Sequence, residues 1–455
     1  MPGFKLASAS ILAMAVALTA CSDDKDNTAV SASNTPTQSA PAAPAVVKAE
    51  SSPEVISAYT EAQAKAVVNH YADIAHATFE DATISAKKLQ KAIDAFMANP
   101  TAETQAAAKQ AWVDARVPYM QTEVFRFGNT IVDDWEGQVN AWPLDEGLID
   151  YVADDYEGET GNPAATANII ANKTIQVGED SIDVSNLTPE LLADLNELAG
   201  IEANVTTGYH AIEFLLWGQD LNGTGPGAGE RSYTDYLQGD ACTNGNCDRR
   251  VQYLKAVTDL LVTDLEEMTA QWKAGVIDNY RAELTKESGE AGIRKMLFGM
   301  GSLSLGELAG ERMKVALEAF SPEDEHDCFS DNTHNSHFYN GLGIKNVYLG
   351  QYKRIDGTLV SGPSLSELVN SMDPAADKAM KEKFEVTQAA LQAIVDSAEK
   401  DNVMFDMLID PENTKGHEIV RTAIKALVDQ TSSIESVAAA LNINELNPDT
   451  ADHEF

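Results

Sequence analysis

The stretch Gly208-Tyr209-His210-Ala211-Ile212-Glu213 lies inside a mostly apolar run from Ile201 to Trp217. At 100° per residue, this run predicts one helix with two different faces. The apolar face can pack against neighbouring helices and carries Ile201, Val205, Tyr209, Ile212, Leu215 and Leu216. The opposite face carries Thr206, His210, Glu213 and Trp217. It therefore places an imidazole and a carboxylate one turn apart, where they can bind one metal ion or share one proton.

The same spacing also occurs in ordinary surface pairs. A His and a Glu three residues apart stabilise an exposed helix by only about 0.2–0.5 kcal/mol. The flanking sequence favours a functional site, because no Lys or Arg occurs between Gly200 and Glu230. A solvated helix face would normally carry such residues.

A second helix is predicted from Glu103 to Phe127, with Thr101 as its cap. Thr104 stands where a capping box has Glu or Gln, so no full box is expected, and Pro118 predicts a kink. One stripe mixes aromatic rings with both signs of charge: Trp112, Arg116, Tyr119 and Glu123. This stripe suits a cleft lining, or else a tie between Arg116 and Glu123 within a bundle. We expect this stripe and the His210 face to line one cleft. Buried together there, the charged groups of the two surfaces can pair with one another.

Helical patterns fill most of the chain, and sustained alternation of apolar and polar residues is almost absent. The predicted class is therefore all-α, as two helical bundles related by a duplication. Residues 53–240 would form the bundle with the His-x-x-Glu motif, and residues 241–455 the second bundle. In the second bundle, a helix from Ala291 to Phe320 carries Ser304, Glu307 and Glu311 on one stripe and Arg312 off that stripe.

Gly208-x-His210-x-x-Glu213 resembles the GxHxxE signature of the imelysin-like family, and the longer run to Gly218 resembles its iron-regulated, bacterial surface-lipoprotein branch. The resemblance extends from about Val55 to the C-terminus. Four further blocks carry it: Trp112-x-x-x-Arg116, Trp142 to Gly147, Gly306 to Met313, and Glu325 to His334. The family is classed with metallopeptidases and is also tied to iron uptake. The resemblance therefore implies a metal-binding protein.

The charge balance restricts the partners. The chain has 455 residues, with 71 acidic and 32 basic side chains and a net charge of −39. Nucleic acid and anionic membrane surfaces would both be repelled. Cations are the natural counterpart, although a strongly charged surface also keeps an exported protein in solution.

The N-terminus predicts export. Residues 1–20 read as a signal peptide with an apolar run from Leu6 to Ala17. Leu18-Thr19-Ala20-Cys21 resembles a lipoprotein cleavage box, so Cys21 would carry the lipid and be the chain's contact with a membrane. Ser22 favours the outer membrane, facing the periplasm or the cell surface. Residues 21–52 lack large apolar side chains and read as a disordered tether. An ordinary signal peptide cleaved after Ala20 is the alternative.

The remaining cysteines would lie in an oxidising compartment. Cys242 and Cys247 flank a short loop in which Gly245 permits a tight turn, so these two are expected to form a disulfide. Cys328 is then a free thiol, or competes for one of the other two.

The expected metal ligands are His210, Glu213 and Glu123. One imidazole with carboxylates suits iron, with zinc or another divalent ion as alternatives. The residues expected to line the ligand site are Trp112, Arg116, Trp217, Ser304, Glu307, Glu311, Arg312 and His326.

Three functions follow from these residues. The first is a metal-binding envelope lipoprotein in iron acquisition, served by an outer-membrane transport partner. The second is a zinc peptidase, and the third is a peptide- or ligand-binding bundle that uses Trp112 and Arg116. Peptidase activity is not expected and no catalytic residue is assigned, because His-Glu-x-x-His is missing: Arg421 stands where the second His would follow His417-Glu418.

Overall fold

The computed structural model describes residues 59–444 and 446–450. The predicted signal peptide, Cys21 and the tether lie outside these residues. Among the residues that are described, no helix has the length and apolar character needed to cross a membrane.

Helices dominate the described chain, which confirms the all-α class. The α-helices are α1 (Glu61–Ala98), α2 (Ala102–Met120), α3 (Thr130–Val139), α4 (Glu146–Ile149), α5 (Pro189–Leu195), α6 (Gly208–Trp217), α7 (Cys247–Gln271), α8 (Tyr280–Leu284), α9 (Gly289–Ser302), α10 (Ala316–Ala319), α11 (Thr333–Leu349), α12 (Leu365–Met372), α13 (Pro374–Asp401), α14 (Phe405–Ile409) and α15 (Thr414–Ala440). The 3₁₀-helices are η1 (Glu123–Phe125), η2 (Leu198–Gly200), η3 (Tyr233–Tyr236), η4 (Gly239–Ala241) and η6 (Pro322–Asp324), and η5 (Leu303–Val315) is a π-helix. Two antiparallel hairpins pair β1 (Thr174–Val177) with β2 (Asp180–Asp183) and β3 (Gln351–Lys353) with β4 (Leu359–Ser361).

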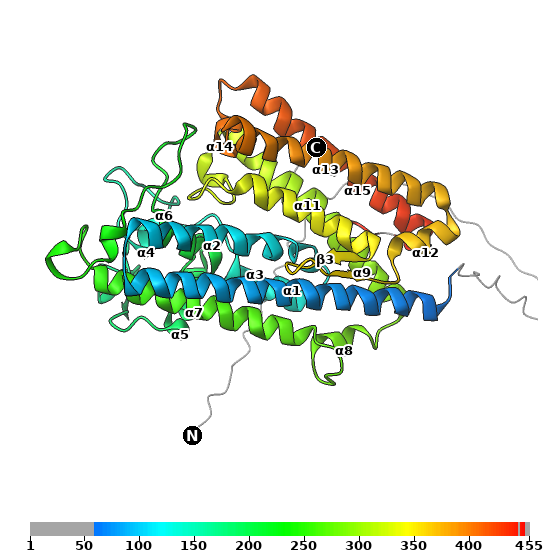
Figure 1. Ribbon diagram of the computed structural model, residues 1–455, viewed down its shortest axis with the longest axis horizontal. Coiled ribbons are helices and arrows are strands. Elements are labelled where there is room, and N and C mark those ends of the chain that lie inside the picture. The colour runs from blue at the N-terminus through cyan, green and yellow to red at the C-terminus, as the bar shows by residue number, and fades with distance from the viewer. Residues whose placement is uncertain (1–58, 445, 451–455) are drawn as a thin grey trace, which may run out of the picture. The chain divides into compact units, whose positions relative to one another are not determined.

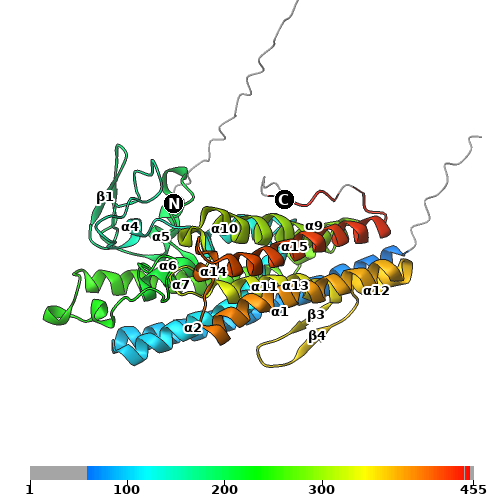
Figure 2. The same ribbon diagram turned by 90° about the horizontal axis from the view of Figure 1, so that it is seen from above.

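The longest helix, α1, runs beside α2, α7 and α9 (Figure 1). α13 packs against α15 and α11, and the β3–β4 hairpin lies beside α1 (Figure 2). The described residues belong to one compact unit. Contacts cross the boundary predicted near residue 240, because α1 precedes that residue and packs on α7 and α9, which follow it.

Helix α6 is buried on every side, from Gly208 to Trp217. Its apolar side chains join a core formed with α2, α7 and the C-terminal half of α1. Its polar side chains are buried as well. The apolar face therefore packs in the hydrophobic core, and the polar face lies in a buried polar region rather than in solvent.

The predicted helix from Ile201 to Trp217 is too long at its N-terminal end. Residues before Gly208 form turns that side chains hold in place: Asn204 donates to the Leu198 carbonyl at 2.6 Å, and Thr207 donates to the Gln138 carbonyl at 2.6 Å. These bonds compete with helical hydrogen bonding, as expected for Asn and Thr. Gly208 then has a φ of +77° and starts the helix.

The helix predicted from Glu103 to Phe127 also ends early. α2 stops at Met120, two residues after Pro118, and Glu123 lies in η1. The prediction about its cap was wrong, because the Thr104 hydroxyl accepts from the Thr101 N–H at 3.0 Å and completes a capping box in place of Glu or Gln. Glu123 therefore does not continue the helical stripe of Trp112 and Arg116.

Residues 128–186 contain α3, α4 and the β1–β2 hairpin, joined by loops. Cys242 and Cys247 are joined in a disulfide with a Cα–Cα distance of 6.0 Å. Cys328 is a free thiol among the cysteines that the structure describes.

Candidate metal centre

The site begins with His210 and Glu213, one turn apart on α6. Both side chains are buried, with exposed fractions of 2% and 0%. His210 Nδ1 lies 2.8 Å from Glu213 Oε2. Glu213 Oε1 accepts hydrogen bonds from the Ser330 N–H at 3.0 Å and the Ser330 hydroxyl at 2.7 Å. Both carboxylate oxygens of Glu213 therefore have partners, and Oε2 holds the His210 ring in place.

The segment between η6 and α11 supplies the other half of the site. It brings His326 against His210, with ring centroids 4.9 Å apart and planes at 80°. The Trp142 ring also lies edge-on to His326, with ring centroids 4.9 Å apart. The next residue, Asp327, is fully buried, and its Oδ2 accepts from Asn332 Nδ2 at 2.9 Å and Ser336 Oγ at 2.5 Å.

One candidate ligand atom each from His210, His326 and Asp327 lies within 4.8 Å of the other two. Among the described residues, neither His210 Nε2 nor His326 Nε2 has a hydrogen-bond partner, although both atoms are buried. The Nδ1 atoms of both rings lie close to carboxylates, since His326 Nδ1 is 3.1 Å from Asp327 Oδ1. A carboxylate at one ring nitrogen and an open second nitrogen is the usual environment of a metal-binding histidine.

Arg116 borders this group. Its Nη2 lies 2.8 Å from Asp327 Oδ1, and its guanidinium carbon lies 5.1 Å from the centre of the Tyr209 ring. Trp112 Nε1 donates to the Tyr209 carbonyl at 2.9 Å. Trp112 and Arg116 thus contact α6 at Tyr209.

Glu123 belongs to a second buried group of charges. Arg312 Nη2 lies 2.7 Å from an oxygen of Glu123 and 2.7 Å from an oxygen of Glu307. Arg126 bridges Glu307 to Glu136 at 3.4 and 3.3 Å. The predicted ligand Glu123 is therefore neutralised by Arg312 and is not one of the three clustered ligands.

The second group corrects the placement of Arg312. Helical spacing of 3.6 residues put Arg312 off the stripe of Glu307, yet Arg312 Nε donates to Glu307 Oε1 at 2.8 Å. The reason is the π-helix η5, whose i→i+5 hydrogen bonding places residues five apart on one side.

The other predicted residues have different positions. Ser304 donates to the Leu427 carbonyl at 3.0 Å and so ties η5 to α15. Trp217 packs edge-on against Trp112 at 5.4 Å, with Lys109 5.0 Å over its ring. Glu311 is partly buried on η5.

Burial and charge set the ionisation of the central groups. Burial lowers the pKa of His210 to about 3, and the charge of Arg116 adds to this effect. Burial likewise holds the pKa of His326 well below its usual range. Burial opposes ionisation of Asp327, but Arg116 and His326 outweigh it and hold its pKa well below normal. The three clustered groups are therefore two neutral imidazoles and one carboxylate at neutral pH.

Two important residues were not singled out from the sequence. Asp327 follows His326 directly, and this neighbouring pair of ligand types was a signal for a site. Asn140 joins the two buried groups, because its Oδ1 accepts from Arg116 Nη1 at 2.5 Å while its Nδ2 donates to Glu136 at 3.0 Å. Helical periodicity has no feature that predicts such a bridging amide.

Comparisons with known proteins agree with this architecture. Iron-regulated protein A of Synechococcus elongatus is 25% identical over 353 residues, which cover 76% of this chain and 78% of that protein. The crystal structure of an iron-regulated protein A precursor from Parabacteroides distasonis has a TM-score of 0.61 and 21% identity, covering 84% of this chain and 96% of that one. An imelysin-like protein from Psychrobacter arcticum has a TM-score of 0.56 and 14% identity, covering 86% and 98%. A sequence model described as imelysin matches residues 75–434, and the chain belongs to the imelysin family.

Proposed function

We propose that this protein binds a transition-metal ion, iron first, and serves iron acquisition as a lipoprotein of the cell envelope. The observation that carries the proposal is the pair of buried imidazoles, His210 and His326, each with an unpartnered Nε2 among the described residues. An unpaired polar atom in the interior is costly, roughly 1–3 kcal/mol. A bound cation would satisfy both atoms at once.

The donor set fits such an ion. Two histidines and one carboxylate are the ligands of many non-haem Fe(II) sites, and zinc accepts the same donors. Neutral imidazoles are the form that metals bind, and burial keeps His210 and His326 in that form. His210, His326 and Asp327 would hold the ion, while Glu213 would fix the orientation of His210.

The charge of Arg116 limits the metal affinity that is expected of the site. Its guanidinium lies 2.8 Å from Asp327 and compensates part of that residue's charge. The site should therefore hold a cation less tightly than an uncompensated carboxylate would. Moderate affinity suits a protein that passes its ion to a transport partner.

The location rests on the sequence. The cleavage box ending at Cys21 and the polar segment 21–52 support a lipid-anchored protein on a tether. The name of the Synechococcus relative, iron-regulated protein A, supports the link to iron.

Metal binding to the purified chain tests the proposal. After removal of metal with a chelator, wild-type protein should take up one Fe(II) per chain under anaerobic conditions, measured by calorimetry and elemental analysis. His210→Ala and His326→Ala should each weaken binding at least about tenfold, as expected when a ligand is lost. Zinc titrated in competition identifies the preferred ion.

His76→Gln is the matched control. His76 lies on α1, where Glu80, Arg281 and Arg354 are among its charged neighbours. This variant should bind metal like wild type, and circular dichroism should show that all variants are folded. Normal binding by folded His210→Ala and His326→Ala would disprove the proposed ligand set.

A further inference from the structure

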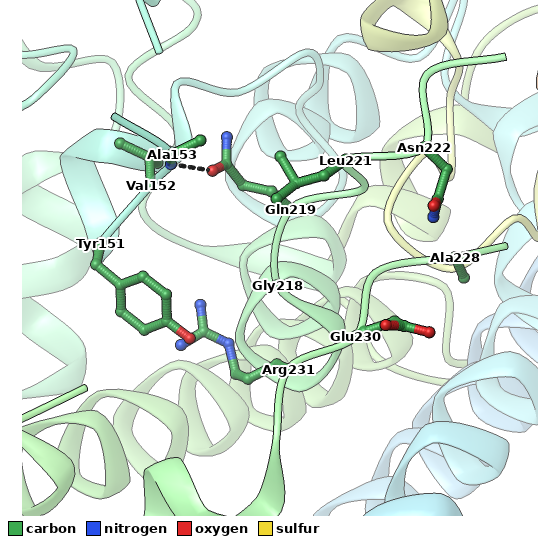
Figure 3. A pocket seen from close by; sticks show the side chains of 10 residues that line it. All are labelled: Tyr151, Val152, Ala153, Gly218, Gln219, Leu221, Asn222, Ala228, Glu230 and Arg231. Atoms are coloured by element: carbon green, nitrogen blue, oxygen red, sulfur yellow. Dashed lines mark hydrogen bonds between the residues drawn. The ribbon is translucent and has the colours of Figure 1, made fainter. Parts of the chain in front are cut away.

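A cavity of about 280 Å³ lies apart from the three clustered ligands, between the segment after α4 and the loop after α6. Figure 3 shows Tyr151, Gln219 and Arg231 around it. The side chain of Arg231 is only 1% exposed although it lines the cavity. A buried guanidinium is normally hydrogen-bonded at each nitrogen, so a nitrogen without a partner marks a place where a ligand could bind.

Arg231 uses one end of its guanidinium and leaves the other edge unpaired. Nη1 donates to Asp150 Oδ2 at 2.6 Å. Within the described part of the chain, Nε and Nη2 have no hydrogen-bond partner. The guanidinium carbon lies 4.8 Å from the centre of the Tyr151 ring and 5.1 Å from that of Phe214. The rings cover its faces and leave the edge formed by Nε and Nη2.

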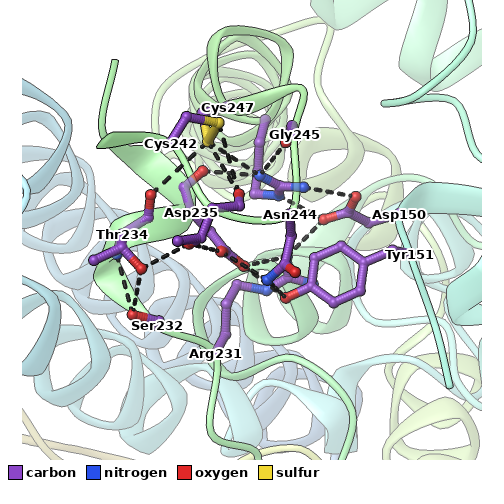
Figure 4. Close-up of a disulfide and its surroundings, with 12 residues drawn as sticks. Asp150, Tyr151, Arg231, Ser232, Thr234, Asp235, Cys242, Asn244, Gly245 and Cys247 are labelled. Atoms are coloured by element: carbon purple, nitrogen blue, oxygen red, sulfur yellow. Dashed lines mark hydrogen bonds and ion pairs between the residues drawn. A yellow bond between two sulfur atoms is a disulfide. The ribbon is translucent and has the colours of Figure 1, made fainter. Parts of the chain in front are cut away.

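The neighbouring Arg250 shows which group binds the Nε and Nη2 edge of an arginine at this place in the fold. Its Nε donates to Asp150 Oδ2 at 2.6 Å and its Nη2 to Asp150 Oδ1 at 3.0 Å, which is a bidentate carboxylate pair. Figure 4 shows Asp150, Tyr151 and Arg231 beside the disulfide of Cys242 and Cys247. Asp150 thus fills the fork of Arg250 completely and reaches Arg231 only at Nη1.

We propose that the Nε and Nη2 edge of Arg231 is the anchor of a second binding site, for a small molecule that carries a carboxylate. A carboxylate matches this edge with two parallel hydrogen bonds, as Asp150 does on Arg250. The cavity volume is at the low end for ligand pockets, so the ligand is small.

The surroundings favour this ligand. Glu230 also lines the cavity, but Figure 3 shows its side chain pointing away from the Arg231 guanidinium. Gln219 is held to the Ala153 N–H by its side-chain oxygen at 2.6 Å, which leaves its amide nitrogen as a donor. Nε and Nη2 of Arg231 are buried, so a ligand would displace neighbouring side chains to reach them and would bind out of water, where charge-assisted hydrogen bonds are stronger.

Titration of metal-free wild-type protein with succinate and with succinamide tests the site. Succinamide has the same size but no charge. Calorimetry should detect succinate and not succinamide. Arg231→Lys keeps the charge but loses the fork, and should weaken succinate binding at least about tenfold, the range expected when a bidentate charged pair is lost.

Glu230→Gln keeps the test decisive if Arg231→Lys does not fold. Glu230 is exposed, and removing its negative charge should tighten succinate binding by about twofold or more. The proposal is overturned if succinate does not bind wild type, if succinamide binds equally well, or if succinate affinity is unchanged in both variants. Sulfate binding as tightly as succinate would also overturn it, because the site would then accept any anion.

Discussion

At the scale of single residues, the candidate centre depends on how His210 distributes its proton. Glu213 Oε2 lies 2.8 Å from Nδ1, and an ionised Glu213 accepts the proton of that nitrogen, which leaves the Nε2 lone pair free for a cation. Burial and then the charge of Asp327 hold the pKa of Glu213 above its usual range, although the two donors of Ser330 at Oε1 favour its ionised form. A cation at Nε2 would favour the ionised form further, so the carboxylate is expected to accept the Nδ1 proton in the metal-bound state.

Glu213→Gln separates an orienting role from a ligand role. The amide can still occupy the same space, but it has one oxygen for the His210 Nδ1–H and the two Ser330 donors. Metal affinity should fall by about 10- to 100-fold, the usual effect of losing an outer partner. Calorimetric titration with Fe(II) measures this change.

Ser330→Ala is the control for that measurement, because it removes one donor to Glu213 and keeps the backbone N–H bond. It should change metal affinity by less than Glu213→Gln does. If Glu213→Gln binds like wild type, then Glu213 does not set the orientation of His210.

At the scale of elements, the structure explains why a glycine begins the GxHxxE motif. Gly208 starts α6 with a φ of +77°, and a Cβ there would lie 2.3 Å from the Val139 carbonyl oxygen. The start of α6 therefore packs directly on the backbone at the end of α3. This contact fixes the helix that carries His210 and Glu213.

Gly208→Ala should lower the free energy of unfolding by roughly 3 kcal/mol or more, because it combines backbone strain with overpacking. Gly200→Ala is the matched control: its φ is +72°, and nothing lies within 4 Å of an added Cβ. The control should cost about 1–2 kcal/mol, the strain alone. Chemical denaturation measures both, and equal losses would mean that the contact with Val139 is easily relieved.

The sequence predicts elements of this kind only as far as local periodicity controls them. The all-α class and the helical character of Gly208–Trp217 follow from spacing and were predicted correctly. The start of α6 was not, because Asn204 and Thr207 bind distant carbonyls that a helical wheel does not include. Arg312 was placed off the stripe of Glu307 because η5 is a π-helix, and its period differs from the one that was assumed.

The candidate site could be predicted in part for the same reason. His210 and Glu213 are neighbours on one turn, so local spacing finds them. His326 and Asp327 come from a segment more than 100 residues later, and only the tertiary fold brings them to α6. The contact between Glu123 and Arg312 is also long-range. Local spacing could not show it, and Glu123 was assigned as a metal ligand.

At the scale of the whole molecule, the net charge of −39 has a counterpart in the interior. Glu325, Asp331 and Asp406 are buried, and each has at least one oxygen without a hydrogen-bond partner among the described residues. Burial raises the pKa of Asp331 to about 7, and the charge of Asp220 adds to this. Burial and then Asp331 raise the pKa of Asp406 to about 7 as well.

These carboxyls and the buried histidines affect stability in opposite directions. A carboxyl with a raised pKa contributes stability below its unfolded pKa of about 3.9, and that stability is lost as the pH rises through about 7. A buried neutral histidine such as His337, whose pKa burial lowers to about 3, contributes stability that is lost as the pH falls below about 6.5. Stability should therefore be greatest near the pH where the two losses balance.

Asp406→Asn isolates the carboxyl part of this balance. The variant has no charge to place in the interior, so its stability relative to wild type should rise with pH. Between about pH 5 and pH 8, the difference in free energy of unfolding between variant and wild type should grow by roughly 1–2 kcal/mol. This is less than the full pKa shift of Asp406 predicts, because Asp331 and Asp406 titrate together. Asp396→Asn is the control: hydrogen bonds from Lys400 and Gln392 lower the pKa of Asp396, so it is ionised throughout this range. Denaturation at both pH values measures the two differences, and a difference for Asp406→Asn that stays constant with pH would show that Asp406 is ionised in the folded protein.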